Sequence, residues 1–132
     1  MVKKIKGFYE NNITEDIVYS NDTLQSELHR IVKRLANGVK PFFLVVLNSD
    51  DKIKGVIARN ELEKMIKEAN KDINSKIKFK YFVKKHKVLL DSDDYANGLR
   101  ELKKKENKGF ILIKNKEENY VGKLLLDKII NS

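Results

Sequence analysis

The sequence predicts an α+β fold made of two copies of a β-α-β-β-α unit. Two segments support this, because each reads as an apolar strand, a polar turn, a glycine-containing strand and the start of a helix: residues 45–66 and 111–130. Their spacing is a further support, since Phe43 and Phe110 each precede the glycine of their copy by 12 positions. The two copies are therefore offset by 67 residues in this region.

The upstream parts of the copies align with a different offset. Ile17 corresponds to Val88 and Leu28 to Leu99, which is an offset of 71 residues. The change from 71 to 67 indicates four additional residues in the first copy, near residues 35–41. Matches that keep their order along the chain are typical of an internal duplication.

The elements of the first copy follow from its periodicity and its turn residues. A short strand at 17–19 precedes a helix that we expect to be capped by Asp22 and to end at Asn37-Gly38. A strand over 41–47, a polar turn and a return strand over 53–58 form a hairpin. Asn60, with Glu63 three residues later, is expected to cap the second helix.

The second copy repeats this order. We expect a strand at 88–90, a helix from about Asp94, a strand at 110–113 and a return strand at 120–126. Its last helix has only residues 127–132 available.

The expected domain boundaries follow from these alignments. Residues 1–70 form the first repeat with an N-terminal lead-in, and residues 71–132 form the second repeat with a shortened last helix. The lead-ins also match, with Lys-Ile-Lys at 4–6 and at 76–78. One unit offers too little core to be stable alone. We expect the two to pack sheet to sheet around a pseudo-two-fold axis, with a cleft between them for a small ligand.

The composition excludes several classes of protein. The chain has 132 residues and no cysteine, which excludes disulfides and thiolate sites and fits a cytoplasmic location. The N-terminus lacks the apolar stretch of a signal peptide. The longest apolar run, residues 42–47, is far shorter than the ~20 residues of a membrane helix.

The net charge of +9 lies mainly in the second half, where 17 basic residues face 10 acidic ones. Solubility explains this charge most simply, and attraction for phosphate or nucleic acid is the alternative. Aromatic rings lie among lysines in residues 76–87, but the alternation there favours a half-buried strand over a surface for stacking bases.

The tandem order resembles the CBS domain pair, also called the Bateman module. The resemblance covers nearly the whole chain and is carried by residues 45–61 in the first copy and 112–128 in the second. It implies a regulatory module, not an enzyme, that binds AMP, ADP, ATP or S-adenosylmethionine without requiring a cofactor. In the family, the base lies beside the first strand, an acidic residue accepts from the ribose hydroxyls, and a Ser or Thr lies near the ribose or phosphate.

Carried over to the first copy, the resemblance gives a partly altered site. Gly55 is present, Ala58 replaces the hydroxyl residue, and Glu61 stands at the acidic position with Arg59 nearby for a phosphate. The candidates for the base slot are Ile17, Val18 and Tyr19. Each also has a structural interpretation: Glu61 as a solvated residue in a first helical turn, Arg59 as a surface residue, and Tyr19 as a packing residue.

The second copy departs further from the family pattern. Gly122 is present, but Leu125 replaces the hydroxyl residue and Lys128 replaces the acid. An ammonium group cannot accept from a ribose hydroxyl. Asp127 lies one position early and is interpreted as a cap. We therefore expect at most one nucleoside site, in the first copy.

Other polar residues favour structural roles. His29 and His86 are isolated in sequence, and Asp91, Asp93 and Asp94 are interpreted as turn and cap residues rather than a metal site. The lysines at 84–87 and 103–105 are interpreted as solvated runs. We find no nucleophile–base pair and no phosphate-binding glycine loop.

Three functions compete at this point. The first is an adenosine-sensing CBS pair that acts on a regulated protein partner. In the family such pairs usually form homodimers through the helices after the third strand, which here would use Leu62, Met65 and Ile66. The second is a ligand-free assembly module, and the third is a nucleic-acid binder that uses the basic second half.

Overall fold

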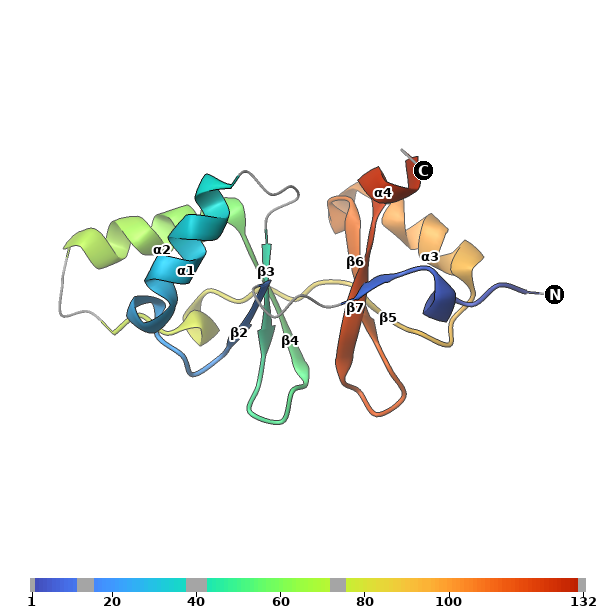
Figure 1. Cartoon of the computed structure of the whole chain (residues 1–132), viewed down its shortest axis with the longest axis horizontal. Coiled ribbons are helices and arrows are strands. Elements are labelled where there is room, and N and C mark those ends of the chain that lie inside the picture. Colours follow the sequence, from blue (N-terminus) through green and yellow to red (C-terminus); the bar gives the residue numbers. More distant parts are fainter. Residues whose placement is uncertain (1, 12–15, 38–42, 72–75, 131–132) are drawn as a thin grey trace. The chain divides into compact units, whose positions relative to one another are not determined.

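Two separate β-sheets, each with its own helices, form the protein in the computed structural model (Figure 1). The structure describes residues 2–11, 16–37, 43–71 and 76–130. The chain divides into two compact units. We call Thr14–Lys85 the β2–α2 unit, and Met1–Ile13 together with His86–Ser132 the β5–α4 unit.

The β2–α2 unit holds the first predicted copy. Its sheet has the order β2-β3-β4, with β2 parallel to β3 and β3 antiparallel to β4. The elements are β2 (Ile17–Tyr19), α1 (Leu24–Ala36), β3 (Phe43–Leu47), β4 (Ile53–Ala58), α2 (Arg59–Lys71) and the 3-10 turn η3 (Phe79–Tyr81). All five residues of β3 are buried, as expected for an apolar central strand. The expected start of this strand at Pro41 and the end of α1 at Gly38 lie outside the described residues.

The β5–α4 unit holds the second copy. Its sheet has the order β1-β7-β6-β5. The elements are η1 (Ile5–Gly7), β1 (Glu10–Asn11), β5 (Val88–Leu90), α3 (Tyr95–Leu102), η4 (Lys105–Asn107), β6 (Phe110–Lys114), β7 (Tyr120–Leu125) and α4 (Leu126–Ile130).

The two sheets share the same pairing register. Ile17 pairs with Val45 in one sheet, and Val88 pairs with Leu112 in the other. Each β-hairpin also has an irregularity one residue before the end of its first strand, after Val46 and after Ile113. These pairs keep the offsets of 71 and 67 residues read from the sequence. The predicted α+β class with two β-α-β-β-α copies is therefore confirmed.

The segment that leads into each repeat, residues 2–11 for the first and 76–85 for the second, packs on the other repeat. The N–H of Ile5 donates to the Asp93 carbonyl at 2.9 Å, and the N–H of Phe79 donates to the Asp22 carbonyl at 3.2 Å. Ile5 thus corresponds to Phe79 in the structure. The matching Lys-Ile-Lys segments would instead align Ile5 with Ile77, two residues earlier. The compact units consequently differ from the expected repeats 1–70 and 71–132, because the lead-ins are exchanged.

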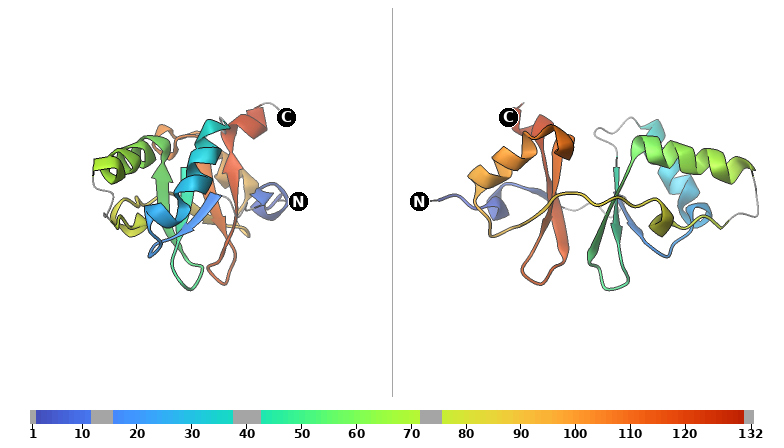
Figure 2. Two further views of the ribbon diagram at one scale, coloured as in Figure 1. Left: turned by 60° about the vertical axis from the view of Figure 1, so that its left-hand side comes forward. Right: turned by 180° about the vertical axis from the view of Figure 1, so that it is seen from behind.

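Helices α1 and α2 lie on the same face of the β2–β3–β4 sheet (Figure 2). The core between them holds nine fully buried residues: Val18, Leu24, Ile31, Leu44, Val46, Ile57, Leu62, Met65 and Phe79. The expected dimer surface on α2 is therefore wrong for Leu62 and Met65, which face this core, while Ile66 is half-buried against it. The exposed side of α2 is charged instead.

Three local expectations are also corrected. Thr23, not Asp22, caps α1, because its hydroxyl accepts from the Ser26 N–H at 3.3 Å. The second helix begins at Arg59, so Asn60 lies inside it. The segment after residue 76 forms a 3-10 turn and not a strand. Its burial was predicted correctly for Phe79, but Tyr81 is 68% exposed.

Candidate functional site

The junction between β4 and α2 brings three of the predicted site residues together. Strand β4 ends at Ala58 and α2 begins at Arg59 without an intervening loop. The first turn of a helix has backbone N–H groups without intrahelical acceptors, so it favours anions. This junction therefore combines a helix N-terminus with the side chains of Ala58, Arg59 and Glu61.

Glu61 is the most constrained polar residue of this junction. Its Oε1 atom lies 3.1 Å from the Lys84 ammonium and 3.6 Å from that of Lys64, and its side chain is only 15% exposed. The hydrogen bond from Lys84 lowers the pKa of the Glu61 carboxyl, against the opposing effect of burial. The carboxylate is thus ionised, with two ammonium groups beside it.

Arg59 is exposed and makes a local contact. Its Nε atom donates to Glu63 Oε1 at 3.1 Å, one helical turn away. Exposed pairs of this kind are worth well under ~1 kcal/mol. The guanidinium can therefore turn toward an incoming anion at little cost.

Gly55 is required by a close backbone contact. Its φ is +150°, and a Cβ at this position would lie 2.2 Å from the carbonyl oxygen of Lys84. That carbonyl accepts from the Val56 N–H at 2.8 Å, and the Lys84 N–H donates back to Val56 at 2.9 Å. The glycine thus lets the lead-in of the second repeat cross β4, which is the same crossing that brings the Lys84 ammonium to Glu61.

The three residues proposed for the base slot do not act as a group. Val18 is buried in the helix-facing core, while Ile17 is half-buried and its carbonyl accepts from Arg30 at 3.1 Å. Tyr19 pairs with Leu47 at the opposite end of the sheet from Ala58. Its hydroxyl donates to Asp51 at 2.9 Å, and this bond raises the pKa of the phenol. Ile17 is the one of the three placed nearer the β4–α2 junction.

The corresponding junction in the second repeat has different chemistry. Gly122 pairs with Asn11 of β1, as Gly55 lies against the other lead-in. Asp127 and Lys128 are both exposed and lie on α4, which spans five residues against 13 in α2. A cation thus occupies the place that Glu61 holds in the first repeat.

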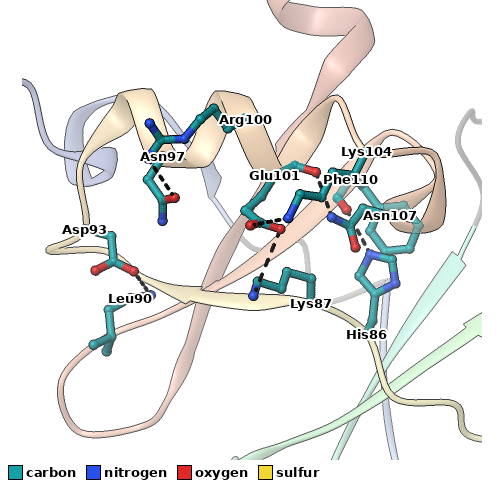
Figure 3. A network of polar contacts seen from close by, with 10 residues as sticks. All are labelled: His86, Lys87, Leu90, Asp93, Asn97, Arg100, Glu101, Lys104, Asn107 and Phe110. Atoms are coloured by element: carbon teal, nitrogen blue, oxygen red, sulfur yellow. Dashed lines mark hydrogen bonds and ion pairs between the residues drawn. The ribbon is translucent and has the colours of Figure 1, made fainter.

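The β5–α4 unit has its most connected polar group elsewhere, at the end of α3 (Figure 3). The Glu101 carboxylate lies 2.9 Å from Lys104 and 4.0 Å from Lys87, and its side chain is 15% exposed. Asn107 donates to the Glu101 carbonyl at 2.6 Å. The lysines of the two predicted solvated runs are exposed, and some of them are also paired. Lys87, in the segment before β5, reaches α3 through its contact with Glu101.

His86 stands beside this network. Its ring stacks on Phe110 with 3.9 Å between centroids, and Nε2 is 2.8 Å from the Phe110 carbonyl oxygen. Burial lowers the pKa of His86 by more than the hydrogen bond to that carbonyl raises it. His29 is exposed on α1, as expected.

Of the aspartates before α3, Asp93 has the predicted turn role, since it accepts from the Leu90 N–H at 3.3 Å. Asp94 occupies the N-cap position of α3, but its side chain makes no capping hydrogen bond and pairs with Lys4 at 2.9 Å instead. In the part of the chain that the structure describes, no group of three or more acidic or histidine side chains is arranged to hold a metal.

Each unit also has a surface hollow at the hairpin end of its sheet. In the β2–α2 unit the hollow measures about 410 Å³ and is lined by Tyr19, Ser20, Asn21, Asp22, Ser49 and Asp51. In the β5–α4 unit it measures about 490 Å³. Three lysines line it, Lys4, Lys6 and Lys116, and its other lining residues are Asp91, Ser92, Asn115, Glu117 and Val121.

The fold resembles solved CBS domain structures. A CBS domain-containing protein of unknown function from Bacillus anthracis matches with a TM-score of 0.72 and 20% identity, over 98% of this chain and 93% of that one. The CBS domains of a transcriptional regulator from Streptococcus pneumoniae match with a TM-score of 0.71 and 13% identity, over 100% of both chains.

A third similar structure is the cystathionine beta-synthase pair domain of a putative Mg2+ transporter from Shewanella oneidensis. It matches with a TM-score of 0.69 and 10% identity, over 97% of this chain and 68% of that one. No protein-family model matches the sequence, and a search of curated proteins gave no significant match. In the described residues, no helix combines the length and apolarity needed to cross a membrane.

Proposed function

We propose that this chain, which has the fold of a tandem CBS domain pair, is a regulatory module that binds an adenosine-containing ligand through its first repeat. The ligand class is AMP, ADP, ATP or S-adenosylmethionine, as the resemblance implies. The site is the β4–α2 junction, with Glu61 as its central residue.

The observation that carries this proposal is the largely buried carboxylate of Glu61 beside two ammonium groups. An ionised carboxylate accepts from both hydroxyls of a ribose. Lys84 at 3.1 Å and Lys64 at 3.6 Å are positioned for a phosphate or another anionic group of the same ligand. Arg59 adds a third cation at the start of the helix.

The route to regulation is the contact between Glu61 and Lys84. Lys84 belongs to the segment that leads into the second repeat, and its backbone forms two hydrogen bonds with that of Val56. A ligand that binds Glu61 competes with the Lys84 ammonium or recruits it. Ligand binding therefore acts on the segment that connects the two repeats, and a regulated partner would respond to that change.

A thermal-shift screen with AMP, ADP, ATP and S-adenosylmethionine tests the proposal. A ligand at 100 times its Kd is expected to stabilise the folded chain by ~2.7 kcal/mol, which raises Tm by several degrees. Glu61→Ala should abolish the shift. Glu101→Ala is the matched control, because Glu101 is equally exposed and also lysine-paired but lies in the other unit.

The outcomes separate the proposal from its alternatives. A shift with any of the four compounds that survives in Glu61→Ala places the ligand elsewhere and contradicts the proposed site. The absence of a shift with all four favours a ligand-free assembly module. One observation supports that alternative, since Lys84 and Lys64 already pair with the Glu61 carboxylate.

A further inference from the structure

We infer that the hollow at the hairpin end of the β5–α4 unit binds a small phosphorylated compound. This site is separate from the β4–α2 junction, because it lies in the other unit. Its lining includes three residues of the β6–β7 turn, Asn115, Lys116 and Glu117. Figure 1 shows this turn at the opposite end of β7 from α4.

The hollow is built by three separate segments of the chain. Lys6 comes from the lead-in, Asp91 follows β5, and Lys116 lies in the β6–β7 turn. Backbone bonds hold these segments together, since the Lys6 N–H donates to Asp91 at 2.9 Å and the Asp91 N–H donates to Lys114 at 2.8 Å. Asn115 fixes the turn by accepting from the N–H groups of two residues that follow it, at 3.1 and 3.0 Å. The walls are thus preformed.

Two of the lysines in this hollow have ammonium groups available to an anionic group of a ligand. Lys4 forms an exposed ion pair with Asp94 at 2.9 Å. Among the described residues, no carboxylate pairs with the ammonium group of Lys6 or of Lys116. The carboxylates of Asp91 and Glu117 line the same hollow beside these two ammonium groups. The several oxygens of a phosphate would accept from the two ammonium groups, because no described carboxylate pairs with them.

The remaining polar residues suit the rest of such a ligand. Asp91 also lines the hollow and makes no ion pair with any described residue. Its carboxylate would accept from ligand hydroxyls, and the Ser92 hydroxyl would donate to or accept from them. A volume of about 490 Å³ is within the usual range for small-molecule sites. A phosphorylated sugar combines the anion and the hydroxyls that this lining would recognise.

The equivalent place in the β2–α2 unit shows that the fold alone does not produce these charges. Lys80 is the structural counterpart of Lys6, because its N–H donates to Ser20 at 3.0 Å as that of Lys6 donates to Asp91. However, the Lys80 ammonium lies over the Tyr81 ring at 5.5 Å and does not line its hollow. That hollow is lined by two aspartates and no cation. The lysine-lined hollow is therefore specific to one unit.

Amide chemical-shift titration of the full chain tests this inference, with ribose 5-phosphate, ribose and inorganic phosphate as probes at constant ionic strength. We expect saturable shifts at Asp91, Ser92 and Lys116 with ribose 5-phosphate and none with ribose. Lys6→Ala and Lys116→Ala should each weaken binding about three- to five-fold, the effect of losing one exposed charge contact. Asp91→Asn should weaken binding of ribose 5-phosphate but not of inorganic phosphate.

Lys80→Ala is the matched control and should leave the affinity unchanged. Its amide spectrum, and those of the other variants, should retain the dispersion of the native chain, which separates lost binding from lost folding. Linear shifts that never saturate would overturn the inference. An equal loss of affinity in Lys80→Ala and Lys6→Ala would overturn it as well. Binding would then depend on the net charge of the chain and not on the lysines of the hollow. Glu61→Ala should not change this titration, so the outcome is independent of the proposed nucleoside site.

Discussion

The two repeats share their strand pairing but have different chemistry at equivalent places. At the strand-to-helix junction, Glu61 in the first repeat corresponds to Lys128 in the second. At the hairpin end, two aspartates and no cation line the first hollow, whereas three lysines, Asp91 and Glu117 line the second. Pairing register and bulge position are shared. The duplicated fold therefore supplies positions, and the side chains at those positions decide what each repeat can bind.

The largest expected difference between the repeats lies in their last helices. Leu62 and Ile129 are equivalent by the 67-residue offset, but Leu62 is fully buried and Ile129 only half-buried. Leu62→Ala should reduce the free energy of unfolding by about 2–5 kcal/mol, and Ile129→Ala by about 1 kcal/mol, because a cavity in a closed core costs more. Urea denaturation monitored by circular dichroism measures both.

Equal losses in these two variants would mean that α4 supports its unit as much as α2 does. Val32→Ala is a suitable control, because Val32 is exposed on α1 and its truncation should change stability by less than about 0.5 kcal/mol.

The next effect concerns the crossing of the lead-in over β4. Gly55→Ala should cost about 3 kcal/mol, because it adds backbone strain and displaces the two backbone hydrogen bonds to Lys84. Gly7→Ala is the matched control, since a Cβ there would meet no atom within 4 Å. Equal stability of the two variants would show that Gly55 is not required by the crossing.

A smaller effect is expected from His86, which has no equivalent in the first repeat. Burial lowers the pKa of the folded-state imidazole, so below pH ~6.5 the unfolded state binds more protons than the folded state. The free energy of unfolding should therefore decrease as the pH falls below ~6.5, and it should be unaffected by this group above that value. Urea denaturation from pH 7.5 to 5 measures the slope.

The His86→Gln variant should have a flatter profile over this range. His29→Gln, which removes an exposed histidine, should keep the slope of the native chain. If both variants retain the slope, His86 does not cause the pH dependence.

Much of the fold could be predicted because duplication made each copy a check on the other. The strands, the hairpins and both glycines followed from the two offsets. The exchange of the lead-ins could not be predicted, because the similarity of the Lys-Ile-Lys segments gave an alignment two residues out of register. Phe79 rather than Ile77 is the counterpart of Ile5, and only long-range backbone contacts reveal this.

The candidate site was predictable in part for the same reason. The family resemblance located Glu61 and Arg59 at the start of a helix, which the structure confirms as their position. Lys84 was missed, since its approach to Glu61 depends on how a segment 23 residues away crosses the sheet. The three residues predicted for the base slot do not lie together. The Val18 side chain is buried in the core, and Tyr19 lies at the end of β2 that is farther from the β4–α2 junction.

The number of adenosine ligands bound per chain tests most directly the claim that the repeats share a fold but not a function. Isothermal titration calorimetry with the compound that gives the largest thermal shift should give one site per chain. Glu61→Ala should remove that site, and Glu101→Ala should retain it. Two sites per chain, or one site that persists in Glu61→Ala, would contradict the assignment of the nucleoside site to the first repeat.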